Sequence, residues 1–80
     1  MSKLKFTVIV DEVLNEFDCK IEGLLYTDDN IAILSYSPDD VNVWRMYIPY
    51  RFMNCARLRY KIMVALDLLV PIYPDLEFGL

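Results

Sequence analysis

Histidine is absent from this chain of 80 residues, which also has only two glycines and two cysteines. Histidine is the usual general base and the commonest transition-metal ligand, so its absence removes catalytic triads and most zinc sites. With only Gly23 and Gly79, the chain has no glycine-rich loop that would hold a phosphate. Cys19 and Cys55 form no C-x-x-C pair. We therefore expect no enzymatic activity, no metal and no cofactor.

The cysteines and the apolar runs indicate the cellular compartment of the protein. Cys19 and Cys55 are interpreted as reduced, buried thiols, with a disulfide between them as the alternative. The first residues lack the apolar run of a secretory signal. The apolar stretch 62–72 is too short to span a membrane and is interrupted by Asp67 and Pro71. These features predict a cytoplasmic protein, in the cytoplasm of the host cell if a virus encodes it.

Charge is segregated along the chain. Residues 1–44 carry nine acids and three lysines, residues 45–66 carry five basic residues and no acid, and residues 67–80 carry three acids. A chain polarised in this way either pairs its halves internally or presents two surfaces of opposite sign. Its apolar content of 56% is high for so small a core, so we also expect a partner or an oligomer to cover part of the surface.

The N-terminal stretch fits two secondary structures. Residues 3–10 are expected to form a strand, because Thr7 to Val10 are all β-branched and Phe6, Val8 and Val10 would share one face. A short helix would follow over 11–17, capped by Asp11 and favoured by Glu12 near its N-terminal end. A helix starting at residue 3 is the competing interpretation, since four apolar residues also fit a 3.6-residue period: Phe6, Ile9, Val13 and Phe17.

The middle of the chain predicts a β-meander. Strands are expected over 20–26, 31–36 and 41–48, joined by turns at 27–30 and 37–40 that are rich in Asp, Asn, Ser and Pro. Successive hairpin turns lie at opposite ends of a sheet. The pairs Asp28/Asp29 and Asp39/Asp40 would therefore form two acidic tips, roughly 20 Å apart.

One long helix is expected over 50–70, between Pro49 and Pro71. Arg59 falls at the edge of its core face, where a guanidinium must pair with an acid or reach water. The core face contains Cys55, Leu58, Ile62, Ala65, Leu66 and Leu69. The opposite side is a mixed basic and apolar stripe of Met53, Arg57, Tyr60, Lys61, Val64 and Leu68.

These elements predict one small α+β domain over 1–80. Residues 1–49 would contain the first strand, the short helix and the meander, giving the order β-α-β-β-β-α. The long helix would pack on one face of an antiparallel sheet of about four strands, leaving the other face open. The tail 71–80, with two prolines, is expected to be extended and to dock on its own domain or on a second chain.

The leading functional hypothesis is a non-enzymatic protein-binding module that acts as a small acidic inhibitor or adaptor. Tyr, Arg and Met are enriched at interfaces, so the stripe, the acidic turns or both would contact another protein. In its small size, its acidity and its lack of catalytic motifs, the chain resembles phage-encoded inhibitors of host defence nucleases. That resemblance implies a chain that blocks a host nuclease or another nucleic-acid-binding protein. The expected contact residues are Met53, Arg57, Tyr60, Lys61, Val64, Leu68, Asp28, Asp29, Asp39 and Asp40.

Two alternatives stay open. The junction between the last meander strand and the long helix interleaves cations with aromatic rings, as nucleic-acid grooves do. The residues are Arg45, Tyr47, Tyr50, Arg51, Phe52, Arg57, Arg59, Tyr60 and Lys61. A sequence pI of about 4.5 argues against that interpretation. The second alternative is a structural homo-oligomer, such as a homodimer, that uses the stripe as its self-interface.

Overall fold

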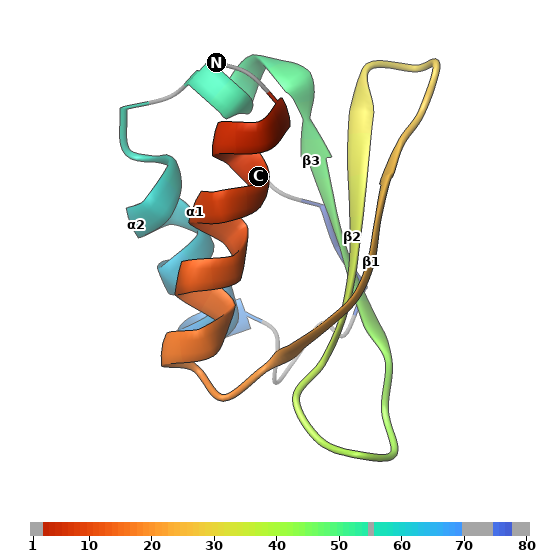
Figure 1. The fold of residues 1–80 in the computed structure, drawn as a ribbon, viewed down its shortest axis with the longest axis vertical. Helices are drawn as coiled ribbons and strands as arrows, with labels where there is room; N and C mark the ends of the chain where they lie inside the picture. The colour runs from red at the N-terminus through yellow and green to blue at the C-terminus, as the bar shows by residue number, and fades with distance from the viewer. Residues whose placement is uncertain (1–2, 55, 70–74, 78–80) are drawn as a thin grey trace.

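Two layers make up the fold in the computed structural model, which describes residues 3–54, 56–69 and 75–77. Helix α1 (Lys3–Glu16) and the helical segments after residue 49 form one layer, and a four-stranded sheet forms the other (Figure 1). The strands are β1 (Lys20–Tyr26), β2 (Ile31–Ser37), β3 (Trp44–Pro49) and β4 (Asp75–Glu77). The small α+β architecture expected from the sequence is confirmed.

Helix α1 corrects the strand expected over residues 3–10. The competing helical interpretation is right, because Phe6, Val10, Val13 and Leu14 repeat at helical spacing and are all fully buried. Contact with the sheet outweighs the β preference of the four consecutive β-branched residues. The expected helix cap at Asp11 is also wrong, since this residue is exposed in the middle of the helix.

A Schellman motif ends α1. The amide of Cys19 donates to the carbonyl of Leu14 at 2.9 Å, and the amide of Asp18 donates to the carbonyl of Asn15 at 3.2 Å. Asp18 takes the left-handed conformation, with a φ of 55°, that glycine usually occupies in this motif. The chain is thereby turned back directly into β1.

The sheet has the order β1-β2-β3-β4 and is mixed. The first three strands are antiparallel, as expected, but β4 runs parallel to β3. The expectation of a fully antiparallel sheet is therefore wrong. Its cause is β4, whose three residues add an edge strand beside β3. Of the tail residues, 71–74 and 78–80 lie outside the described residues.

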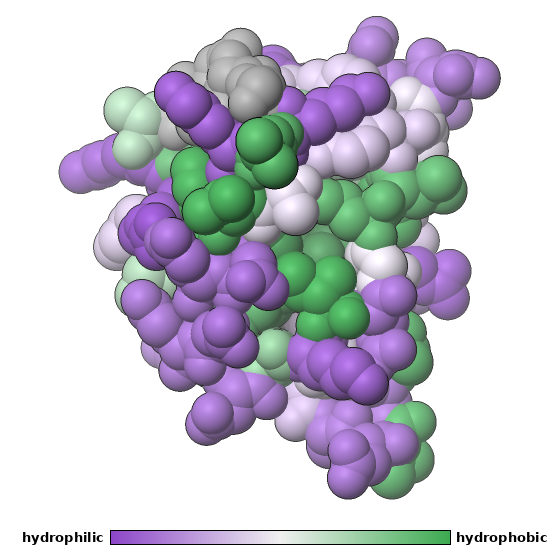
Figure 2. Space-filling model, in the orientation of Figure 1, coloured by the Kyte–Doolittle hydropathy of each residue, from purple (hydrophilic) through white to green (hydrophobic). Residues whose placement is uncertain are grey.

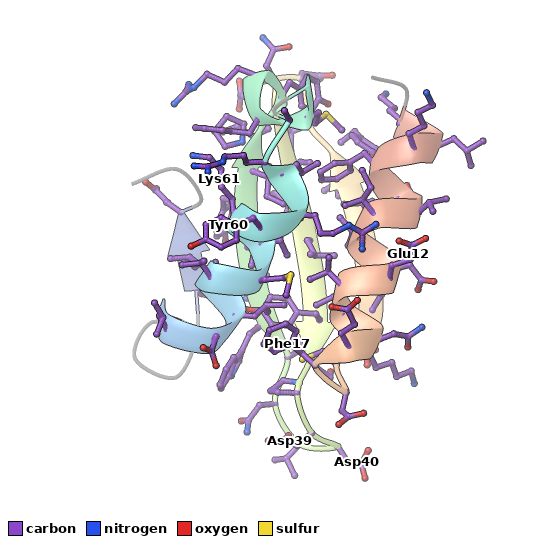
Figure 3. The ribbon with its side chains drawn as sticks, turned by 90° about the vertical axis from the view of Figure 1, so that its left-hand side faces the viewer. Glu12, Phe17, Asp39, Asp40, Tyr60 and Lys61 are labelled. Carbon is purple, nitrogen blue, oxygen red and sulfur yellow. The ribbon has the colours of Figure 1, made fainter. Side chains whose placement is uncertain are left out.

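One face of the sheet carries the core. Residues alternate along each strand, so β2 and β3 point one set of apolar side chains toward the helices and the other set away. The inward side chains are at most 5% exposed and comprise Ala32, Leu34, Tyr36, Met46, Ile48 and Leu76. Helices α1 and α2 cover this face, and the opposite face has no covering layer among the described residues (Figures 1 and 3).

The long helix expected over 50–70 is wrong. A 3₁₀ turn over Tyr50–Asn54 precedes α2 (Leu58–Val64), and a wider π-helical turn follows over Ala65–Leu69. Tyr50 explains part of the break: its amide donates to the Asn30 carbonyl at 2.9 Å and its hydroxyl to the Thr27 carbonyl at 3.0 Å. These bonds hold the start of the segment against the β1–β2 turn.

Part of the core face expected for that helix is confirmed. Leu58, Ile62, Ala65 and Leu66 are all buried. Cys55 and the side chain of Leu69 lie outside the described part of the structure. Arg59 pairs with Glu12, which joins α2 to α1, and its side chain also reaches solvent, being 46% exposed.

The valines of α1 distinguish a helix from a strand. Val8 and Val10 would share one face of a strand, but here Val10 is fully buried and Val8 is 48% exposed. We expect Val10→Ala to lower the free energy of unfolding by about 1.5–3 kcal/mol, from two lost methyl groups and a cavity. Val8→Ala should change it by less than about 0.5 kcal/mol. Urea denaturation measures both, and equal losses would favour the strand.

Candidate partner-binding surfaces

A cluster of cations and aromatic rings lies on the outside of the 3₁₀ turn and α2. Two cations lie over the Phe52 ring. The Arg51 guanidinium carbon is 4.8 Å and the Lys61 ammonium nitrogen 5.1 Å from the ring centroid. The Arg57 guanidinium carbon lies 5.8 Å from the centroid of Tyr60. These five residues are called the cation–aromatic surface below.

The local fold explains why this surface is exposed. Leu58 and Ile62 turn toward the sheet and are buried, so Tyr60 and Lys61 must project outward. Figure 3 shows both side chains extending from α2 on the side away from α1. Tyr60 is 61% exposed, which leaves one side of its ring accessible. Cations held against rings are partly ordered before any partner binds, and this lowers the entropic cost of binding.

The structure divides the expected stripe. Arg57, Tyr60 and Leu68 are exposed, and Lys61 and Val64 are partly exposed. Met53 is only 6% exposed and packs in the core, so its expected place on the stripe is wrong. The error follows from the broken helix, because the 3₁₀ turn rotates Met53 toward the sheet. The sequence prediction places Arg51 and Phe52 only in the nucleic-acid alternative, although a cation beside a ring is visible at these adjacent positions.

The acidic turns lie at opposite ends of the sheet, as expected (Figure 1). Asp28 and Asp29 lie in the β1–β2 turn, which Asn30 completes with a φ of 61°. Asp39 and Asp40 lie in the β2–β3 loop, at the end of the molecule labelled in Figure 3. The two pairs are too far apart to act as one site.

An acidic pocket of about 510 Å³ adjoins the second pair. Four carboxylates and one lysine give its lining a formal charge of −3. Val41 and Val43, at its edge, are 87% and 56% exposed. The pocket is lined by Asp18, Lys20, Glu22, Ser37, Pro38, Asp39, Asp40, Val41, Asn42 and Val43. The sequence prediction does not find these apolar lining residues, because it places residues 41–43 in a strand, whereas β3 begins at Trp44.

Asp39 shapes this loop. Its Oδ1 accepts hydrogen bonds from the backbone amides of Asn42 at 2.7 Å and Val41 at 2.8 Å, and its Oδ2 accepts one from the Asn42 side chain at 3.0 Å. These donors, led by the Asn42 amide, lower the pKa of the Asp39 carboxyl. The same bonds keep residues 41 and 42 out of the ladder, so β3 begins at Trp44.

The uncovered face of the sheet offers a third surface. Leu25, Ile33 and Tyr47 lie in one row across β1, β2 and β3, with Arg45 in the next row opposite Asp75. Leu25 is 60% exposed, and the other two are partly buried by their neighbours. Arg45 and Tyr47 therefore face away from the cation–aromatic surface, which divides the residues grouped in the nucleic-acid alternative.

Two polar groups are at least partly buried. The Tyr36 hydroxyl is fully buried and has no hydrogen-bond partner among the described residues, and burial raises the pKa of this phenol. Cys19 is a free thiol whose pKa is raised by burial and then by Asp18. Within the described part of the chain, no three Cys, Asp or Glu side chains are grouped to hold a metal ion.

Comparison with known proteins finds no matching family model, no significantly similar curated protein and no significantly similar solved structure. Among the described residues, no helix has the length and apolar character needed to cross a membrane.

The Asp39 hydrogen bonds predict a pH-dependent loop. Because the folded carboxyl has a lowered pKa, its stabilisation of the loop is complete above the ordinary value of 3.8 and is lost as the pH falls through the lowered value. In an NMR titration, the amide protons of Val41 and Asn42 should shift with a midpoint below 3.8. Asp39→Asn keeps an acceptor and should abolish that titration. A midpoint at or above the ordinary value would contradict the assignment.

Proposed function

We propose that this chain is a non-enzymatic protein-binding module that uses the cation–aromatic surface to bind an acidic site on another protein. The observation that supports the proposal is the grouping of three cations around two rings, Phe52 and Tyr60, in a chain whose net charge is −4. Tyrosine and arginine are the residue types that most often anchor interfaces.

The surface suits a folded protein or peptide with carboxylates beside apolar groups. Arg51, Arg57 and Lys61 supply charge for carboxylates, while Tyr60, which is 61% exposed, supplies area for apolar side chains. The charged groups would govern the rate and specificity of binding, and burial of the ring would supply most of the affinity. An inhibitor or adaptor needs only this surface and a stable fold behind it.

The uncovered sheet face is a weaker candidate. In the space-filling view, apolar side chains gather in a band between the helix side and the strand side of the molecule, and hydrophilic side chains surround them (Figure 2). On the sheet face itself, the row of Leu25, Ile33 and Tyr47 ends at Glu77. Of the three residues in this row, only Leu25 has a strongly exposed side chain.

A fluorescent peptide of alternating glutamate and leucine tests the proposal. The wild-type protein should bind it, and combining Arg57→Ala with Tyr60→Ala should weaken binding by about tenfold or more. Both side chains are exposed, so the fold should be unchanged by circular dichroism. The matched control combines Arg45→Ala with Leu25→Ala, which removes one cation and one exposed apolar group from the sheet face and should leave binding unchanged.

The same titration separates the alternatives. A single-stranded oligonucleotide that binds more tightly than the peptide, with a steep dependence on salt, would favour nucleic acid instead. Loss of peptide binding only in the Arg45/Leu25 variant would move the contact to the sheet face. Equal binding by the wild type and the Arg57/Tyr60 variant would overturn the proposed surface.

A further inference from the structure

The acidic pocket beside the β2–β3 loop matches the partner that the cation–aromatic surface requires. Its lining carries a formal charge of −3, and Arg51, Arg57 and Lys61 carry +3. Val41 and Val43 are exposed apolar residues of the pocket lining, and Tyr60 is an exposed ring on the cation–aromatic surface. Each surface therefore combines charge of one sign with exposed apolar area.

The two surfaces cannot meet within one molecule. Asp39 and Asp40 lie at one end of the molecule, whereas Tyr60 and Lys61 project sideways from α2 nearer the other end (Figure 3). The longest dimension of the molecule is 31 Å. A contact between the two surfaces therefore requires two copies, and it is heterologous, because different surfaces of each copy are used.

We propose that the cation–aromatic surface of one copy docks on the acidic pocket of a second copy, giving a head-to-tail assembly. This inference rests on the proposed function, since it names the partner of that surface. A pocket of about 510 Å³ has room for projecting side chains such as those of Arg57 and Tyr60. The net charge of −4 repels two copies at long range, so attraction depends on these opposite surfaces meeting.

Charge complementarity favours head-to-tail docking of a second copy over a symmetric two-fold dimer. A dimer through two cation–aromatic surfaces would place like charges face to face, and so would a dimer through two acidic pockets. Pairing one surface with the other cancels the +3 against the −3. A pair of copies retains one free surface of each kind, one on each copy, so the assembly grows by repetition until it closes or the protein becomes too dilute.

Two charge-reversal variants test the inference. The first combines Arg57→Glu with Lys61→Glu, and the second combines Asp40→Lys with Val41→Lys. All four side chains are at least partly exposed, and the Asp39 hydrogen bonds that order the loop are retained. A control that combines Arg45→Glu with Leu25→Glu adds negative charge to the sheet face.

Sedimentation velocity over a concentration series gives the readout. The wild type and the control should exceed the monomer mass of 9.4 kDa as concentration rises, while each charge-reversal variant alone remains at that mass. An equimolar mixture of the two variants should regain at least twice the monomer mass, because each supplies the surface that the other lacks. A mixture that stays monomeric would overturn the inference.

The outcomes separate this inference from the proposed function. A wild type that stays monomeric at every concentration, yet binds the glutamate–leucine peptide, would overturn head-to-tail assembly and leave the proposed surface standing. Association that persists in the Arg57/Lys61 variant would also overturn it. Loss of association in the sheet-face control alone would assign the self-interface to that face instead.

Discussion

Packing of α1 against the inner face of the sheet is the contact on which the rest of the structure depends. Phe6, Val10, Val13 and Leu14 are completely buried, in the same core cluster as side chains of β2 and β3. No other element among the described residues supplies as many fully buried side chains. Since the domain is small, these residues form much of its core. Their burial also sets where α2 packs, because α2 fills the remaining part of the same face (Figure 3).

This arrangement decides which charged residues reach solvent. Arg59 lies beside α1 and is paired with Glu12, so it links the two helices and is less available to a partner. Arg57 and Lys61 lie on the outer side of the same helix and associate with rings instead of carboxylates. The basic residues of 45–66 are therefore divided among an interhelical ion pair, the sheet face and the cation–aromatic surface, which is why the segregation of charge along the chain becomes a separation of surfaces in space.

The sequence allowed prediction of the elements that local patterns determine. Strands β1 and β2 and the turn at Asn30 follow from alternation and turn residues, and they were placed almost to the residue. Features set by contacts distant in sequence were missed. Residues 3–10 suit a strand locally and become helical because their apolar side chains pack on the sheet. The segment 50–70 begins as a 3₁₀ turn that Tyr50 bonds to the β1–β2 turn, and it continues as α2 and a π-helical turn instead of one long helix. The acidic pocket depends on how Asp39 holds its loop.

The central claim is that the cation–aromatic surface of one copy contacts the acidic pocket of another, and that the uncovered sheet face takes no part in this contact. Backbone amide chemical shifts of the ¹⁵N-labelled wild type, compared between dilute and concentrated samples, test this most directly. The account predicts concentration-dependent shifts in two groups, at residues 51–61 and 38–43, with Leu25, Ile33 and Tyr47 unchanged. Shifts centred on those three residues, or none at any concentration, would contradict it.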